Sequence, residues 1–211
     1  MPLVLTILAV VSAALTIISK ARESKRGEYI FKPLTTTLIL AIALLADNPI
    51  SSTYRALIAA GLVASLAGDV FLMLPDRFTP GLLSFLIAHI FYILAFTHES
   101  SGMAPIWYII PFVLYGVVIL RWLWPHLGSV RVPVMIYMGA ILIMAYQAAN
   151  RWIETAQDGT LLALAGAYLF VASDSALAVN MFRGRFRGAD FIVLSTYFAA
   201  QLLIAWSVYG R

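Results

Sequence analysis

Two aspartates inside otherwise apolar runs are the residues of this chain most suited to chemistry. Asp69 lies in the stretch from Gly61 to Leu74, and Asp174 lies in the stretch from Gly166 to Phe182. A charged side chain at membrane depth costs about 2.5 to 3.5 kcal/mol on insertion scales, so retained carboxyls there are candidates for function. The alternative is a packing role, with each carboxyl protonated or paired to a basic residue of the next loop. Two aspartates at matching places favour function.

A pair of carboxyl groups can supply both an acid and a base. If Asp69 and Asp174 meet, they cannot both ionise cheaply in an apolar setting, so the pair is expected to share one proton. The protonated member can donate to a substrate and the ionised member can activate water. This chemistry suits a hydrolase, provided that the tertiary structure brings the two side chains together.

Further polar residues at helical spacing are candidates for lining the same site. The set comprises Lys32, His89, Tyr92, Ser173, Asn180, Tyr197 and Gln201. His89 and Tyr92 are three residues apart and Tyr197 and Gln201 are four apart, so each pair shares a helix face. Hydrogen bonds between helices would explain these four equally well. Lys32 is expected at the mouth of a span, where a lysine either reaches the headgroups or contacts a phosphate. Weaker candidates are Thr35, Thr36, Thr37, Tyr137, Tyr146, Gln147 and Asn150.

The composition places these residues in a membrane. Of 211 residues, 62% are hydrophobic and 11% are charged, with a mean hydropathy of +0.92, whereas soluble domains are about 45 to 50% apolar. A span needs about 20 apolar residues, so residues 1–211 form a single transmembrane domain. The predicted fold class is an all-α bundle of eight transmembrane helices in the cell membrane, the inner membrane if the source is bacterial. The apolar segments are 3–19, 33–46, 55–74, 80–97, 104–120, 132–149, 160–182 and 191–209.

The positions of the basic residues predict an orientation. If the loops alternate across the membrane, eleven Lys and Arg fall on one side and three on the other. Cytoplasmic loops carry an excess of basic residues, so both termini are predicted on the outer side. The third and seventh segments then run in the same direction with their aspartates in the inner half. We therefore also predict a parallel repeat of spans one to four and five to eight.

Several function classes are excluded or disfavoured by what the sequence lacks. It contains no cysteine, which removes disulfides, thiolate nucleophiles and thiolate metal sites. It has no Gly-x-Ser-x-Gly elbow, His-Glu-x-x-His motif, Walker loop or dinucleotide fingerprint. We expect no metal and no cofactor. The net charge of +4 reflects orientation on an anionic leaflet, so no nucleic-acid partner is expected. Nothing in the sequence predicts an oligomeric state.

The polar motifs, taken together, resemble those of the YhhN family of membrane proteins, whose animal members include the lysoplasmalogenases. The motifs are Gly68-Asp69-x-x-Leu72-Met73, His89-x-x-Tyr92, Ser173-Asp174-x-x-Leu177-Ala178 and Thr196-Tyr197-x-x-Ala200-Gln201, with Lys32-Pro33-Leu34-Thr35 before them. The resemblance covers nearly the whole chain. It implies an eight-helix enzyme whose catalytic pair would be Asp69 and Asp174.

The implied activity is hydrolysis of the vinyl ether bond of a lysoplasmalogen, a lysophospholipid, to a fatty aldehyde and a glycerophospho-alcohol. The reaction begins with protonation of an alkene carbon and passes through an oxocarbenium ion, so it needs a positioned acid and a nearby anion. A proton-coupled transporter of lipids or small molecules, using the same aspartates as a relay, is the alternative. Transporters often break their helices at the site, and the two Asp-bearing segments contain no proline.

Overall fold

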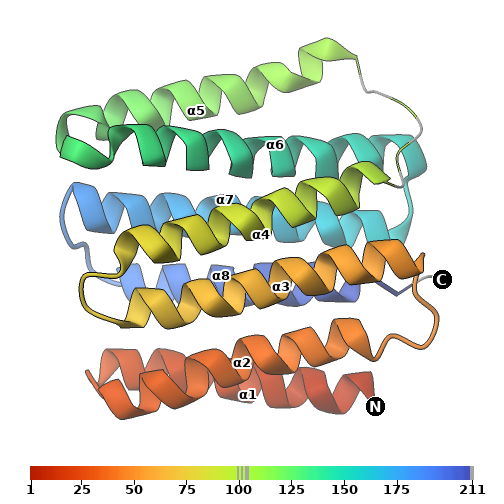
Figure 1. The fold of residues 1–211 in the computed structure, drawn as a ribbon, viewed down its shortest axis with the longest axis horizontal. Coiled ribbons are helices and arrows are strands. Elements are labelled where there is room, and N and C mark those ends of the chain that lie inside the picture. Colours follow the sequence, from red (N-terminus) through yellow and green to blue (C-terminus); the bar gives the residue numbers. More distant parts are fainter. Residues whose placement is uncertain (99, 101, 103–104, 210–211) are drawn as a thin grey trace.

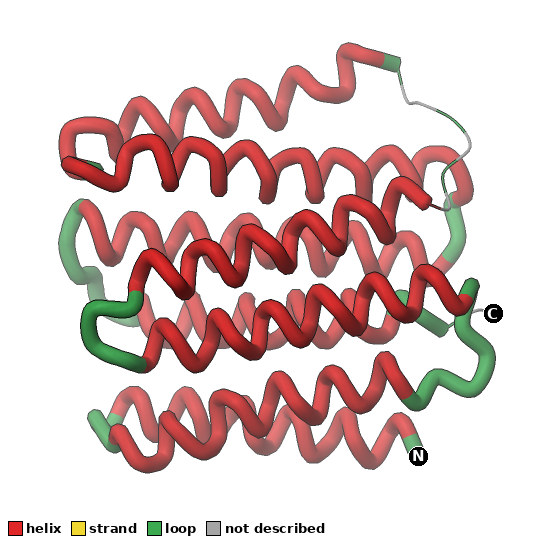
Figure 2. Tube along the Cα trace, viewed as in Figure 1, coloured by secondary structure: helices red, strands yellow, loops and turns green. Residues whose placement is uncertain are grey.

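The chain folds into eight α-helices within the part of the computed structural model that is described, residues 1–98, 100, 102 and 105–209. Figure 1 shows them as a bundle of roughly parallel rods, and Figure 2 shows that the described connections are short. The helices are α1 Pro2–Ala21, α2 Lys25–Leu44, α3 Ser52–Met73, α4 Phe78–His98, α5 Ile110–Leu123, α6 Arg131–Thr155, α7 Asp158–Phe182 and α8 Ala189–Trp206. Short 3₁₀ turns flank α5 at Ile106–Ile109, Trp124–His126 and Gly128–Val130.

Eight helical segments are long and apolar enough to span a membrane, counted over the described residues. The predicted all-α membrane bundle is therefore confirmed, and the chain is an integral multi-pass membrane protein. Successive helices run antiparallel, and both termini lie at the end opposite the α3–α4 connection. Which membrane face each end meets, and whether the two halves form a repeat, remain predictions.

The second helix begins eight residues earlier than the segment predicted to start at Pro33. Ser24 caps its N-terminus by accepting a hydrogen bond from the backbone N–H of Gly27, which is a common way to begin a helix. Pro33 therefore lies inside the helix. In the same turn, the hydroxyls of Ser12 and Thr35 both donate to the carbonyl of Phe31.

Three helical hairpins, helix α6 and a loosely packed edge helix, α5, make up the bundle. The pairs α1 and α2, α3 and α4, and α7 and α8 pack most extensively, while α2 and α3 also contact α8, and α6 contacts both α4 and α7. Helix α5 lies at the edge, beside α6. The loops that follow α1, α3, α5 and α7 share one end of the bundle and carry or adjoin most of the basic residues. We call this the basic end.

Polar contacts join helices that are both near and far in the sequence. Tyr54 and Ser207 pair at 2.8 Å between α3 and the end of α8, and the hydroxyl oxygens of Thr35 and Ser12 lie 2.8 Å apart between α2 and α1. Lipid chains are as apolar as leucine, so membrane helices associate through close packing and such hydrogen bonds. These contacts fix which helices become neighbours and so position the candidate site.

Candidate active site

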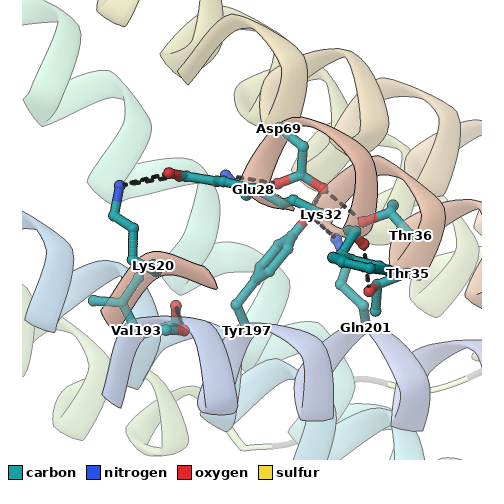
Figure 3. Close-up of polar contacts among 11 residues, drawn as sticks. Lys20, Glu28, Lys32, Thr35, Thr36, Asp69, Val193, Tyr197 and Gln201 are labelled. Carbon is teal, nitrogen blue, oxygen red and sulfur yellow. Dashed lines mark hydrogen bonds and ion pairs between the residues drawn. The ribbon is translucent and has the colours of Figure 1, made fainter. Parts of the chain in front are cut away.

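Asp69 is the centre of a buried polar cluster, in which two other helices contact its carboxylate. It lies four residues before the end of α3 and is fully buried. Its Oδ2 accepts hydrogen bonds from Thr36 Oγ1 of α2 at 2.6 Å and from Tyr197 OH of α8 at 2.7 Å. Its Oδ1 lies 3.3 Å from Lys32 Nζ of α2. Figure 3 shows these side chains converging on the carboxylate.

Beyond Tyr197, the cluster continues as a chain of hydrogen bonds between α8 and α4. Gln201 Nε2 donates to Tyr197 OH at 3.3 Å, and Tyr92 OH donates to Gln201 Oε1 at 2.7 Å. Both bonds are buried. Because each member has a partner, the chain orients Tyr197 toward Asp69 without leaving its own polar groups unsatisfied.

Asp174 has a simpler environment on the facing side of the bundle. Its Oδ2 accepts a hydrogen bond from the hydroxyl of Tyr137, which projects from α6. The neighbouring Ser173 Oγ donates to the backbone carbonyl of Val193 at 3.0 Å, which ties α7 to α8. In contrast to Asp69, Asp174 has no ion-pair partner among the described residues.

Both carboxyl groups line one cavity in the half of the bundle nearest the basic end. Its polar lining comprises Lys32, Asp69, Tyr137, Ser173, Asp174, Ser175 and Tyr197. The rest of the wall is apolar and includes Leu72, Phe78, Phe85, Ile141, Val171 and Phe182. The cavity volume is about 90 Å³, which is room for a few water molecules or a short piece of a ligand. The cavity thus offers two carboxyls a common apolar space.

The structure places the predicted site residues in three groups. Lys32, Asp69, Ser173, Asp174 and Tyr197 line the cavity. Tyr92 and Gln201 lie behind Tyr197 and reach the cavity only through it. His89 and Asn180 do not belong to the described lining.

His89 is buried in an aromatic cluster behind the cavity wall. Its ring lies 5.1 Å from that of Tyr137 and 4.8 Å from that of Phe170, edge to face in both cases. Neither ring nitrogen has a hydrogen-bond partner among the described residues. Asn180 instead accepts a hydrogen bond from the N–H of Phe186 at 3.4 Å and supports the α7–α8 loop.

The predicted position of Lys32 at the mouth of a span is wrong. Because α2 starts at Lys25, Lys32 lies about two turns inside the helix, and only 8% of its surface is exposed. A cation buried to this degree needs a counter-ion, and Asp69 supplies it. Lys32 therefore contacts the carboxylate directly.

Two partners of the carboxyls were only weak candidates from sequence. Thr36 is one helical turn from Lys32, so the two share a face once α2 is known to include Pro33. Tyr137 has no such signal, because its role depends on how α6 packs against α7. The other weak candidates include Asn150, which donates to Ser100 Oγ at 3.1 Å and to the carbonyl of Gly102 at 3.2 Å, away from the cavity.

The unequal surroundings suit the two carboxyls to different work. Asp69 has a lysine and two hydroxyl donors beside it, whereas Asp174 has one hydroxyl donor in an apolar setting. Opposite charge and hydrogen bonds both stabilise a carboxylate, so Asp69 has more of the contacts that suit that form. Within the described residues, no three His, Cys, Asp or Glu side chains gather as a metal site would require.

Comparison with known proteins gives consistent matches. The model of the YhhN family matches residues 27–208. The Escherichia coli protein named uncharacterized membrane protein YhhN (strain CFT073) is 31% identical over 94% of this chain and 95% of its own length. Human lysoplasmalogenase TMEM86B is 36% identical over 74% of this chain and 65% of its own. The lysoplasmalogenase of Mycobacterium bovis is 31% identical over 86% and 70%. No solved structure matches at a significant level.

Proposed function

The chain belongs to the YhhN family, and we propose that it is a lysoplasmalogenase, which hydrolyses the vinyl ether bond of a lysophospholipid within the membrane. Relatives named lysoplasmalogenase, in human and in Mycobacterium bovis, support the substrate class. The observation that carries the proposal is the placement of Asp69 and Asp174 on one apolar cavity, with only Asp69 paired to a cation.

We assign the acid to Asp174 and the base to Asp69. Oδ2 of Asp174 accepts from Tyr137, so the acidic proton resides on Oδ1. Asp69 remains a carboxylate beside Lys32 and can stabilise a developing positive charge across the cavity. Electrostatic stabilisation of this kind is strong where water is excluded.

The first step forms a carbon–hydrogen bond. Asp174 transfers its proton to the alkene carbon farther from the ether oxygen, and the alkene electron pair forms that bond. The remaining carbon and the ether oxygen share the positive charge as an oxocarbenium ion. Water then adds to the carbon beside the oxygen while Asp69 takes one of its protons, which leaves a hemiacetal.

The second half of the reaction restores both carboxyls. Asp69 returns its proton to the ether oxygen as the carbon–oxygen bond breaks. The hemiacetal hydroxyl gives its proton to Asp174, and the aldehyde and the glycerophospho-alcohol form. Asp174 is again neutral and Asp69 again ionised, so no other proton source is needed. Many glycoside hydrolases likewise use two carboxyl groups that exchange protons with the substrate and water.

The test uses the purified full-length protein in detergent with an alkenyl lysophospholipid. We expect release of a fatty aldehyde, and in D₂O the aldehyde should carry one deuterium on the carbon next to the carbonyl, because that carbon accepts the proton. Folded protein that releases no aldehyde would overturn the proposed substrate. Substrate or proton flux in liposomes without any product would instead favour a transporter.

Carboxyl variants test the assignment of the pair. Asp69→Asn and Asp174→Asn should each lower kcat by roughly 100-fold or more, since general acid–base groups contribute at least that much. Asp190→Asn is the matched control, because Asp190 is exposed in the first turn of α8 and away from the cavity. Full turnover by either of the first two variants would exclude carboxylate-pair catalysis.

A further inference from the structure

A second hollow lies on the lipid-facing side of the bundle, between α5, α6 and α7. Its walls include Phe112 and Tyr115 of α5, Leu142 of α6, and Tyr168 and Val171 of α7. Tyr115 is 37% exposed and Tyr168 is 49% exposed, so the hollow faces the surrounding hydrocarbon. Helix α5 forms its outer wall and packs only lightly on α6 and α7. We call this hollow the α5 groove.

The α5 groove adjoins the candidate active site. Val171 lines both the groove and the cavity that holds the carboxyls. One turn further along α7, Ser175 lines the cavity, and its Oγ pairs with Tyr115 OH of the groove at 2.6 Å. Ser175 already donates its proton to the carbonyl of Val171 at 2.7 Å, so Tyr115 is the donor in the pair. Val171, Ser175 and Tyr115 thus form the partition between the two spaces.

The α5 groove offers more room than the cavity that holds the carboxyls. The volume is about 280 Å³ for the groove and about 90 Å³ for the cavity. A long hydrocarbon chain attached to a reacting vinyl ether is therefore accommodated better by the groove and the cavity together than by the cavity alone. The apolar space that adjoins the wall at Val171 is the α5 groove.

We propose that the α5 groove binds the hydrocarbon chain of the lysophospholipid, with the vinyl ether passing Val171 to reach Asp69 and Asp174. This inference rests on the proposed function and adds the subsite for the chain. The chain stays in apolar surroundings throughout, so its transfer from lipid needs no exposure to water. The loose packing of α5 permits lateral entry from the bilayer. The hydrogen bond from the Tyr115 hydroxyl to Ser175 links α5 to α7.

Photolabelling tests occupancy of the α5 groove without relying on turnover. The probe is a non-cleavable alkyl ether lysophospholipid with a diazirine in the outer part of its chain. We expect labelling at Phe112, Tyr115 or Tyr168, and we expect excess unlabelled alkenyl lysophospholipid to lower it several-fold while the same excess of a diacyl phospholipid does not. Labelling spread over exposed positions of α1, or equal competition by both lipids, would overturn the proposal.

A blocking variant tests whether the groove serves the reaction. Leu142→Phe places a ring in the groove, whose described lining includes Leu142 while that of the cavity does not, and should lower kcat/KM roughly tenfold or more for a long-chain substrate, because the added ring occupies space that the substrate chain needs. Turnover of a short-chain vinyl ether, which fits in the cavity alone, should stay within roughly twofold of wild type. The matched control is Val118→Phe on the lipid-exposed side of α5, where Val118 is 64% exposed. This variant should leave kcat/KM unchanged for both substrates.

Each outcome of the kinetic test decides the matter. Equal losses with both substrates would mean that Leu142→Phe disturbs the carboxyls, and no loss with either would mean that the chain lies elsewhere; both overturn the proposal. If Leu142→Phe does not fold, Phe112→Trp narrows the groove from the side of α5, again outside the described cavity lining, and should show the same dependence on chain length. Wild-type protein that binds the probe in the groove but releases no aldehyde would refute the proposed reaction and leave the subsite standing.

Discussion

At the scale of single residues, the central feature is a buried ion pair between Lys32 and Asp69. The two groups come from different helices and are largely shielded from solvent, with side-chain exposures of 10% and 1%. Breaking such a pair by removing one partner costs more than the pair itself contributes, because the other charge is left desolvated. The pair therefore positions Asp69 and provides a counter-charge for it.

Replacing Lys32 tests what the ion pair contributes to stability and to turnover. Lys32→Met should lower the free energy of unfolding by up to about 3 to 5 kcal/mol, the range for a broken buried pair. It should also lower kcat, because Asp69 then takes up a proton. The measurement is aldehyde release together with thermal unfolding in detergent. Lys20→Met is the control, since Lys20 is 37% exposed in its pair with Glu28 and exposed pairs contribute little. Unchanged turnover in Lys32→Met would show that Asp69 needs no cation.

His89 provides a second test at this scale. Within the described part of the chain its ring nitrogens have no hydrogen-bond partner, and its ring contacts are with Tyr137 and Phe170. Exchanging a buried, unpaired polar group for an apolar one of similar shape is often neutral or stabilising, so His89→Phe should keep kcat/KM within roughly threefold of wild type and should not lower the unfolding temperature. A loss as large as that of Asp174→Asn would show that His89 acts on the substrate or through Tyr137.

At the scale of helices, close approach between α7 and α8 positions the two sides of the cavity. A Cβ on Gly166 would lie 2.8 Å from the backbone carbonyl oxygen of Ala200 and 2.8 Å from Cγ1 of Ile204. Backbone cannot move aside as a flexible side chain can. Only glycine lets these helices meet at this distance, and small residues serve this purpose in many membrane interfaces.

Substitution of Gly166 should change both the stability of the protein and its turnover. Gly166→Ala should lower the free energy of unfolding by about 1 to 3 kcal/mol, as overpacking does, and should reduce turnover by shifting Tyr197 relative to Asp174. Gly139→Ala is the matched control, because nothing lies within 4 Å of the added Cβ; alanine there should be neutral or slightly stabilising. Both are measured by unfolding in detergent and by aldehyde release. Equal behaviour of the two variants would contradict a close-packing role for Gly166.

At the scale of the whole molecule, charge separates the two ends of the bundle. The loops at the basic end include Arg22, Arg77, Arg183, Arg185 and Arg187. At the opposite end, Arg151 is only 2% exposed and lies over the ring of Tyr54 at 4.2 Å, so it adds little to the surface charge there. The asymmetry predicts that the basic end faces the cytoplasm.

Cysteine labelling tests this orientation directly, because the native chain has no cysteine. In intact cells, a membrane-impermeant maleimide should label Gln157→Cys in the α6–α7 loop and should not label Arg185→Cys in the α7–α8 loop until the membrane is opened. Both positions are exposed, so accessibility depends only on the side of the membrane. The reverse pattern would invert the topology and place the cavity in the outer half of the bilayer.

The sequence by itself determined the fold class and the number of spans, and it singled out the two aspartates as candidates for function. Each of these depends on local properties: the length of an apolar run, and the cost of a carboxyl inside it. The same local logic placed the start of the second segment at residue 33, where the apolar run begins, whereas α2 begins eight residues earlier at the turn capped by Ser24.

Only the tertiary structure decided which side chains meet. The cation of Lys32 reaches Asp69 because α2 packs on α3, Tyr137 reaches Asp174 because α6 packs on α7, and His89 is turned behind the cavity wall. Spacing along one helix predicts a shared face, but the partner of that face depends on how separate helices pack. This packing places the carboxyl groups of Asp69 and Asp174 on one apolar cavity, and the proposed reaction requires that arrangement.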